Sequence, residues 1–473
     1  MTDAPVIYWM RRDFRLADNP ALCAAATGGR PVIPVFIYDP QVKALGAAPK
    51  WRLGQAIARF RNTLEGRGSR LVLRRGTALD VLKSLIAETG AQEVVWGRLY
   101  DPEARGRDTR VKAALNADGI AAVSYPGHVV FEPWTAQTRD GGFYKVYSPF
   151  WRAVKDREAG SPLPAPEHLP APATWPISAQ LNEWGLACAM GRGASVVAQH
   201  VHVGEAAAGA RLRHFIAEKV GRYAAERDFL DRDACSGLSE NLTYGEVSAR
   251  LCWHLGAQAM QAGAAGAERF LRELIWRDFA CHLLYHTPHI TSRNWRGGWD
   301  AFPWATGDDS PGLLAWKQGR TGVQVIDAAM REMYVTGRMH NRARMLVASY
   351  LTKHMMVHWR EGAHWFEECL IDWDPASNAM GWQWVAGSGP DAAPYFRIFN
   401  PQTQAMKFDA DGRYRRRWLA ELNANPGREA MAYFEAIPKD WGLSPDMPYP
   451  KAPVVGMVQG RARALHAYAN RTF

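Results

Sequence analysis

Two spacings of hydrophobic residues divide the chain. Over residues 1–130, short runs of β-branched and aromatic residues alternate with amphipathic stretches, which is the pattern of strands followed by helices. Repeated β–α units predict an α/β domain with a doubly wound parallel sheet, whose ligands bind at the carboxyl ends of the strands. We expect strands at 6–9, 32–38, 71–74, 93–97 and 121–125, and helices at 18–27, 51–66, 78–89 and 103–118.

The pattern changes after residue 130. Residues 131–205 include a proline-rich stretch, 160–176, which cannot hold a regular element for long, so we interpret 131–205 as a surface connector. Within it, 145–152 is expected to be ordered. From 206 to 473 apolar residues recur at helical spacing, which predicts an all-α domain. Its expected helices are 206–226, 244–260, 266–284, 322–336, 341–359 and 375–386.

Composition narrows the functional classes. The formal net charge of +10 and the pI near 9.3 favour a polyanionic partner. Six dispersed cysteines without a C-x-x-C pair argue against a zinc or iron–sulfur site and indicate free thiols in a reducing cytoplasm. No apolar run is long enough to cross a membrane and no signal peptide is recognisable, so neither insertion nor export is expected. The α/β part lacks both G-x-G-x-x-G after its first strand and G-x-x-x-x-G-K-[ST].

The densest chemistry lies in and just before the expected helix 375–386. Asp374 is placed to cap this helix, on which Asn378 and Trp382 would share one face while Trp384 points the other way. The residues alone leave two readings open. In the first, Asp374 only caps the helix and the tryptophans only fill the core. In the second, the helix offers an amide and an indole to one cavity and a second indole to another.

The string D-W-D-P-A-S-N-A-x-x-W-Q-W, followed by Y-F-R-I-F-N-P, resembles the flavin-binding signature of the DNA photolyase/cryptochrome family. The opening Y-W-M-R-R-D-F-R-L-A-D-N-P-A-L resembles the family's N-terminal signature, with Met10 where an aromatic residue is commoner. Several segments look similar to bacterial photolyases of class I and class III, between which we do not choose. The resemblance implies an antenna-chromophore type of domain at 1–130, a connector at 131–205, and an FAD- and DNA-binding helical domain at 206–473.

The resemblance also implies where FAD binds. Arg344 would pair with Asp372, which would accept from a ring N–H, and Asn378 would face ring nitrogen N5. Cys235 and Gly237 depart from the family pattern, in which Thr or Ser and Arg are usual; from the residues alone, this Gly/Ser run is a plain N-cap. The implied cofactor-binding residues are Tyr223, Cys235, Ser236, Gly237, Leu238, Ser239, Arg344, Asp372, Trp373, Asp374 and Asn378.

The choice of substrate is implied by two positions. Relatives that repair (6-4) photoproducts carry His where this chain has Asn341 and Met345, so the chain matches the repairers of cyclobutane dimers. Glu273 and Trp276 would share a helix face and contact the flipped dimer, with Trp384 on the other wall. The implied catalytic residues are Glu273, Trp276, Asn341, Asn378 and Trp384. The implied DNA-binding residues are Arg227, Glu273, Trp276, Asn341, Arg342, Met345, Trp384, Arg397, Gln404 and Lys407, although each charged one taken alone also fits a solvated surface.

Three tryptophans match the family's chain that carries electrons from solvent to the flavin. They are Trp304, Trp359 and Trp382, and Trp299 competes for the place of Trp304. From spacing alone, three core tryptophans remain the alternative.

Taken together, the resemblance implies a deoxyribodipyrimidine photo-lyase acting on UV-damaged DNA as a monomer. Reduced FAD would absorb blue light and pass an electron to a flipped-out cyclobutane pyrimidine dimer; the ring splits and the electron returns. The alternatives are a cryptochrome-like blue-light receptor and a non-enzymatic DNA-binding module. The amide Asn378, the Asn341 and Met345 pair, and the end of the chain at Phe473 without a long polar tail count against a receptor.

A second, antenna chromophore would bind in the α/β domain. A methenyltetrahydrofolate and an 8-hydroxy-deazaflavin both remain open, because 101–108 does not reproduce the Asn-Glu pair of some folate binders. Trp51 is considered as a stacking platform for it.

Overall fold

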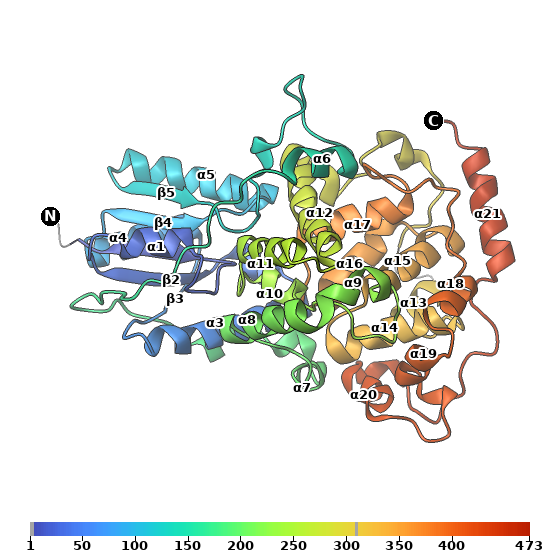
Figure 1. The fold of residues 1–473 in the computed structure, drawn as a ribbon. Helices are drawn as coiled ribbons and strands as arrows, with labels where there is room; N and C mark the ends of the chain where they lie inside the picture. Colours follow the sequence, from blue (N-terminus) through green and yellow to red (C-terminus); the bar gives the residue numbers. More distant parts are fainter. Residues whose placement is uncertain (1–3, 308–310) are drawn as a thin grey trace.

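The fold combines a parallel sheet with a helical region (Figure 1). The computed structural model describes residues 4–307 and 311–473. Five strands lie in the order β3-β2-β1-β4-β5, and every neighbouring pair is parallel. Their bounds agree with the predicted ones to within one residue: β1 Val6–Met10, β2 Val32–Tyr38, β3 Val72–Arg75, β4 Glu93–Gly97 and β5 Ala121–Tyr125.

Alternation along β1 shows why the strands are apolar throughout. Tyr8 points into a core that includes residues of α1 (Pro20–Ala26) and α3 (Ala47–Glu65). Ile7 and Trp9, on either side of Tyr8, point to the other face and pack with α4 (Ala78–Thr89) and α5 (Pro102–Ala117). A parallel sheet covered on both faces needs apolar residues at every strand position. The predicted doubly wound sheet is therefore confirmed; the short helix α2 (Pro40–Ala44) was not predicted.

The connector runs along the sheet region. Val32 N donates to Pro170 O at 2.8 Å and Ala179 N donates to Leu73 O at 2.9 Å, so the connector adds backbone hydrogen bonds to β2 and β3. The segment expected to be ordered is α6 (Tyr147–Val154), which packs against α12. A short helix, α7 (Gly193–Val197), precedes the helical region.

The C-terminal region is helical, as predicted (Figure 1). Its helices are α8 Glu205–His214, α9 Val220–Glu226, α10 Ser239–Thr243, α11 Ala249–Gln261, α12 Ala267–His286, α13 Pro311–Lys317, α14 Gln324–Thr336, α15 Asn341–Ser349, α16 Trp359–Cys369, α17 Pro375–Ala386, α18 Pro401–Phe408, α19 Arg413–Trp418, α20 Arg428–Ala436 and α21 Met457–Ala469. A π-helical turn, Phe215–Lys219, joins α8 and α9 within the predicted helix 206–226.

Two predicted helices are wrong in their bounds. The one expected from 244 begins only at α11, because Gly245 has φ +64° and an added Cβ would lie 2.1 Å from Arg12 O, and because Ser248 Oγ caps the helix at Leu251 N (2.9 Å). The single helix expected over 341–359 is α15 followed by a π-helical turn, Tyr350–His354.

The chain then reverses at Met356 (φ +59°), and α16, which was not predicted, begins at Trp359. The apolar run around Met356 does not predict this break. The π-helical turn packs against α21 and Val357 pairs with Ala305, and both partners are distant in sequence.

Candidate functional site

Helix α17 forms as its sequence predicts. Asp374 Oδ1 accepts from Ser377 N at 2.9 Å and Pro375 occupies the first turn, where its missing N–H costs nothing. The helix ends at Gly387, which is left-handed (φ +92°). Asp374 also forms an ion pair with Arg12 of the α/β region at 3.4 Å, so this cap ties the two regions together.

The structure brings Arg344 and Asp372 together. Arg344 Nη2 donates to both carboxylate oxygens of buried Asp372, at 2.9 and 2.8 Å. Arg344 Nε donates to Met339 O (2.9 Å), and Thr243 Oγ1 donates to Asp372 O (3.2 Å). Arg344 of α15 thus holds the carboxylate, whereas Thr243 of α10 holds the backbone carbonyl of the same residue.

Loop 235–239 lies beside this pair. Cys235 Sγ lies 3.9 Å from His340 Nε2, and burial raises the pKa of the thiol to about 11 while it lowers the pKa of His340 to about 4. Both groups are neutral at pH 7, so Cys235 is a packing residue rather than a reactive thiolate. Ser236 is half-buried and Ser239 is exposed, which leaves both hydroxyls reachable by a ligand. Tyr223 packs edge-on against Phe215.

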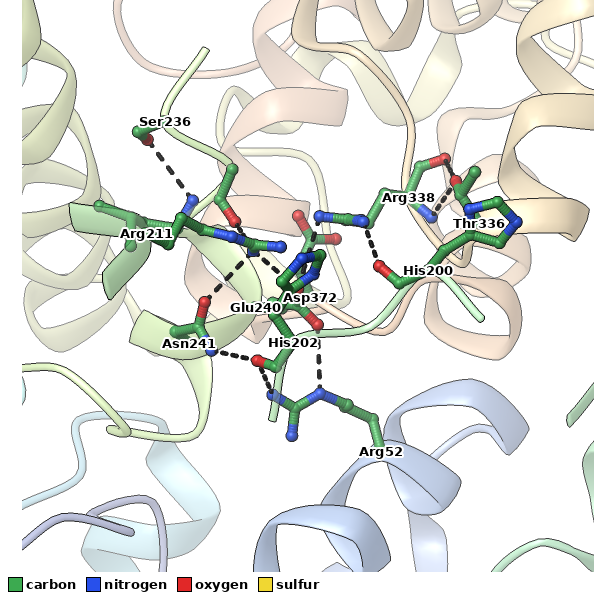
Figure 2. A network of polar contacts seen from close by, with 12 residues as sticks. Arg52, His200, His202, Arg211, Ser236, Glu240, Asn241, Thr336, Arg338 and Asp372 are labelled. Atoms are coloured by element: carbon green, nitrogen blue, oxygen red, sulfur yellow. Dashed lines mark hydrogen bonds and ion pairs between the residues drawn. The ribbon is translucent and has the colours of Figure 1, made fainter. Parts of the chain in front are cut away.

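A buried ion-pair network that the sequence analysis missed lies next to the loop (Figure 2). Arg52 of α3, which is 0% exposed, pairs with Glu246 at 2.6 Å and with Glu240 at 3.2 Å. Glu240 also pairs with Arg211 at 2.8 Å and with Arg338 at 3.4 Å. The one signal in the sequence was an arginine among the apolar positions of the helix 51–66.

The residues predicted to contact a dimer come from three helices. Glu273 and Trp276 lie on α12, Asn341 and Met345 lie on α15 beside Arg344, and half-buried Trp384 lies on α17. Trp276 stacks on Tyr147 of α6, with ring centroids 3.7 Å apart and planes at 8°. Tyr147 OH donates to Arg272 O at 2.6 Å, so one face of the indole is covered by a fixed ring.

Two predicted DNA-contacting arginines are already paired within the protein. Arg227 is buried and pairs with Glu273, which also contacts Arg269 at 3.1 Å. Arg342 pairs with Asp228 at 2.7 Å and lies over Phe408. These contacts suit Arg227 to orienting the Glu273 carboxylate and Arg342 to orienting the Phe408 ring, rather than to binding phosphate directly.

The other predicted DNA-contacting residues follow α17. Arg397 and Lys407 are exposed, and Gln404 is half-buried with an Oε1 that has no hydrogen-bond partner among the described residues. The neighbouring Phe396 is 59% exposed. Together these positions form a basic surface with an aromatic side chain on it.

The three tryptophans predicted to carry electrons are all buried in one core cluster. Trp304 Nε1 donates to Thr352 O (2.9 Å) and Trp359 Nε1 to Asn294 Oδ1 (2.8 Å). His358 lies between these two indoles, with ring centroids at 5.2 and 5.4 Å. Trp299, the competing position, stacks on Trp304 at 5.5 Å. Each of the three tryptophans is therefore part of the hydrophobic core, and electron transfer through them stays a prediction.

Trp382 occupies a close-fitting place in this core. Its ring lies 4.9 Å from that of Phe366, and an added Cβ on Gly362 would lie 2.0 Å from the indole. Only a glycine lets α16 approach the Trp382 ring so closely.

A crevice of about 280 Å³ opens between the carboxyl edge of the sheet and the helical region. It lies where the strand order reverses between β1 and β4, and its lining includes Trp9, Asp39, Arg107, Asn378 and Trp373. Arg107 pairs with Asp39 at 2.7 Å, and Asn378 Nδ2 donates to Ala363 O at 3.0 Å.

The suggestion that Trp51 is a stacking platform is wrong. Trp51 is 4% exposed and belongs to a separate core cluster with Val197 and Ile371, outside the crevice lining. Its large apolar ring is used to join α3 to the helical region.

The described residues contain neither a candidate metal centre nor a candidate membrane-spanning helix. No set of three or more His, Cys, Asp or Glu side chains in 4–307 and 311–473 is arranged to hold a metal ion. Within the same ranges, none of the helices combines the length and apolar character that a membrane crossing requires.

Comparison with known proteins identifies the family. The chain is 44% identical over 472 residues to a deoxyribodipyrimidine photo-lyase of Agrobacterium fabrum, a match that covers 98% of each chain. The chain belongs to the DNA photolyase/cryptochrome family. The family model described as DNA photolyase matches residues 6–171, and the one described as FAD binding domain of DNA photolyase matches residues 270–470.

Both branches of the photolyase/cryptochrome family are represented among the relatives. A bacterial class III photolyase from Agrobacterium tumefaciens superimposes with a TM-score of 0.91 at 42% identity, over 99% of this chain and 98% of that one. Cryptochrome-1 of Arabidopsis thaliana is 33% identical over 97% of this chain and 69% of its own length.

The residues present fit an FAD. The fixed Asp372 carboxylate supplies an acceptor for a ring N–H, and two reachable hydroxyls, Ser236 and Ser239, flank Gly237. Gly237 has φ +64°, and an added Cβ would meet only the Arg211 side chain, at 3.5 Å. The loop therefore offers two hydroxyls on either side of a residue that has no side chain.

Proposed function

We propose that this protein is a deoxyribodipyrimidine photo-lyase that repairs cyclobutane pyrimidine dimers in DNA with FAD as its cofactor. The observation that carries the proposal is the composition of α15. This helix bears Arg344, which holds Asp372 at the predicted flavin site, and also Asn341 and Met345, the pair typical of cyclobutane-dimer repair. The full-length likeness to a deoxyribodipyrimidine photo-lyase supports it.

When bound in its reduced form, FAD supplies the light absorption and the electron that split the cyclobutane ring. The chain's own residues position the reactants. Glu273, fixed by Arg227 and Arg269, presents a carboxylate to the polar edges of two flipped pyrimidines. Trp276, backed by Tyr147, offers its free face for stacking, which contributes about 1–3 kcal/mol per base.

The basic surface after α17 would hold the DNA backbone. Arg397 and Lys407 are exposed there, and the chain carries a net charge of +10. Contacts of this kind release counterions, so the affinity for damaged DNA should fall steeply between 50 and 200 mM salt, by about tenfold or more. Titration of a fluorescent dimer-containing duplex at several salt concentrations measures this slope.

The repair reaction is tested with an oligonucleotide that contains one cyclobutane thymine dimer. We expect the purified, FAD-loaded and reduced protein to restore the thymines under blue light and not in the dark, and to leave a (6-4) photoproduct intact. Dimers that survive illumination with bound, reduced flavin would contradict the proposal and favour the alternative of a cryptochrome-like blue-light receptor.

Glu273 provides the matched variant pair. Glu273→Ala should lower the repair yield per bound flavin by about tenfold or more, because a hydrogen bond between the substrate and this half-buried carboxylate is worth about 1.5–3 kcal/mol. Glu268→Ala, on the same helix and paired with Arg272 on the surface, should leave the yield unchanged. Equal yields for both variants would remove Glu273 from the substrate site.

The crevice at the β1 and β4 switch point is our proposed site for an antenna chromophore. Trp9, flanked by the guanidinium groups of Arg11 (4.4 Å) and Arg107 (4.9 Å), lies in its lining. A folate and a deazaflavin have different absorption bands, so the spectrum of the purified protein decides between them. We also place the protein in the cytoplasm, in keeping with its free cysteines. We further propose that it is a monomer.

A further inference from the structure

The buried network beside loop 235–239 carries unequal charge. Three guanidinium groups, those of Arg52, Arg211 and Arg338, meet two carboxylates, those of Glu240 and Glu246. Both carboxylates are 0% exposed. The network therefore holds one more positive than negative charge, and the guanidinium groups of Arg211 (12% exposed) and Arg338 (24% exposed) are its parts that solvent or a ligand can reach.

The neighbouring groups do not remove this surplus. Burial and the nearby guanidinium groups lower the pKa of His200 and of His202, so both are neutral at pH 7 and neither contributes negative charge. Asp372 is already paired with Arg344. Glu332 is directed to other partners, since its Oε2 accepts from Tyr414 OH (2.5 Å) and from His340 N (3.4 Å).

A guanidinium group that is mostly shielded from water and lacks a counter-charge is unfavourable, and a bound ion of opposite sign relieves this. An anion bound next to the network would neutralise its surplus positive charge. Arg52 does not provide the binding surface, because its Nε, Nη1 and Nη2 all donate to Glu240 or Glu246. That leaves Arg211 and Arg338.

Arg211 faces the loop directly (Figure 2). Its Nη1 donates to the carbonyl of Gly237 and contacts Glu240 (2.8 Å) and Asn241 (3.3 Å). The guanidinium carbon would lie in ordinary contact, 3.5 Å, with a Cβ on Gly237, and glycine is favoured at this position by its φ of +64°. Arg338 approaches the same Glu240 from α14's C-terminal side, held by His200 O.

We propose that Arg211 and Arg338 are the counter-charges of the FAD diphosphate, and that Arg211 also fixes the backbone of loop 235–239. The inference rests on the proposed FAD site and adds two positioning residues to it. Guanidinium groups pair with phosphate oxygens through directed, charge-assisted hydrogen bonds. The diphosphate would neutralise the surplus charge, so the network and the cofactor stabilise each other.

The first experiment measures FAD binding to the apoprotein by flavin fluorescence. Arg211→Gln and Arg338→Gln should each raise the Kd for FAD at least tenfold and flatten its dependence on KCl. Arg250→Gln is the control, because Arg250 forms a comparable pair between the two regions, with Asp18 (2.9 Å), away from the loop. Kd values for the two variants that stay within twofold of the wild type would overturn the proposal.

The second experiment uses inorganic pyrophosphate on the apoprotein and the melting temperature as readout, which does not depend on flavin chemistry. Pyrophosphate should raise the Tm of the wild type and of Arg250→Gln, and raise it less for Arg211→Gln. Glu240→Gln, which increases the surplus, should show a larger rise than the wild type. Equal responses in the wild type, Arg211→Gln and Glu240→Gln would contradict the inference.

The two experiments separate this inference from the proposed function. A wild-type protein that binds FAD but does not repair dimers would refute photolyase activity and leave the counter-charge role standing. A wild-type protein that takes up no FAD would refute the proposed cofactor, and with it the assignment to a diphosphate of FAD. Circular dichroism of each variant identifies any loss of fold, and Arg211→Lys then replaces a variant that fails to fold.

Discussion

At the scale of single residues, burial decides which polar groups can act. Around the predicted flavin site it keeps the Cys235 thiol and the His340 imidazole neutral, and it lowers the pKa of Lys353, near the tryptophan cluster, to about 7. In contrast, the Asp372 carboxylate has a counter-charge, because Arg344 contacts both its oxygens. Among these groups, the charge proposed to act on the flavin is therefore on the carboxylate that a guanidinium group compensates.

The contact between Gly362 and Trp382 gives a prediction for one methyl group. Gly362→Ala would place its Cβ 2.0 Å from the indole, so we expect a loss of stability of about 1–3 kcal/mol through overpacking. Gly381→Ala, on α17, meets nothing within 4 Å and should gain about 0.5–1 kcal/mol of helix propensity. Urea unfolding of both variants measures the difference, and a Gly362→Ala protein as stable as the wild type would contradict it.

Asp278 gives a prediction for pH. Its Oδ2 accepts from Val130 N and Phe131 N at 2.8 and 2.9 Å, and burial raises its pKa from 3.8 to about 7. Because the folded state binds this proton more tightly, the contribution to stability is complete below pH 3.8 and is lost as pH rises through 7.

Asp278→Asn keeps an acceptor and cannot ionise. We therefore expect the stability advantage of the variant over the wild type to grow between pH 5.5 and pH 8, by at most about 1.4 kcal/mol per pH unit. Denaturant unfolding at both pH values measures it. An advantage that is constant or shrinks with rising pH would show that Asp278 is ionised throughout.

At the scale of elements, helix ends position the predicted site. Asp374 caps α17 and presents Asn378 one turn later, whereas the start of α15 places Arg344 against Asp372. Gln383, buried in α17, accepts from Trp295 N at 2.8 Å and donates to Ile290 O at 2.7 Å. These bonds hold the loop before Trp299 and Trp304 against the helix, so α17 organises both the polar site and the tryptophan cluster.

The Asp374 cap is testable by two substitutions. Asp374→Ala should destabilise the apoprotein by about 1–2 kcal/mol, since both the bond to Ser377 N and the ion pair to Arg12 are lost. Asp374→Asn keeps a good cap and should lose only the smaller ion-pair part. Thermal unfolding without flavin compares them, and equal losses would mean that the ion pair, rather than the cap, dominates.

At the scale of the whole molecule, charged contacts fix the α/β region to the helical region. Arg52 lies between Glu240 and Glu246, and Glu205 accepts from Leu16 N and Ala17 N, both at 2.8 Å. These contacts join α3 and the segment after β1 to α8 and α10. The loop predicted to bind the FAD phosphates is thus anchored to both regions, which makes cofactor binding dependent on the correct docking of the sheet.

Breaking the central pair should be costly. Arg52→Ala leaves Glu246 buried and unpaired, so we expect a loss of about 3–5 kcal/mol. Arg61→Ala, on the same helix, breaks only an exposed pair with Glu65 at 3.8 Å and should change stability by less than about 1 kcal/mol. Chemical unfolding followed by tryptophan fluorescence measures both; a loss below 1 kcal/mol for Arg52→Ala would show that water replaces the arginine.

The sequence by itself determined the five strands and the helix α17. Runs of β-branched and aromatic residues, Pro375 and an Asp cap act between neighbours along the chain, and such short-range effects are readable without a structure. The family and its motif positions were likewise readable, because a signature is a linear string. The pairing of Arg344 with Asp372 was predicted only because that resemblance supplied it.

Tertiary structure alone decided the rest. The break after α15, the start of α11 at Gly245 and the burial of Trp51 depend on atoms far away in sequence. The network joining Arg52, Glu240 and Arg211 depends on them too. Buried charges choose partners by distance and dielectric environment, neither of which is encoded by local spacing. The chain therefore specifies its elements locally, and it specifies its charged site only after those elements have packed.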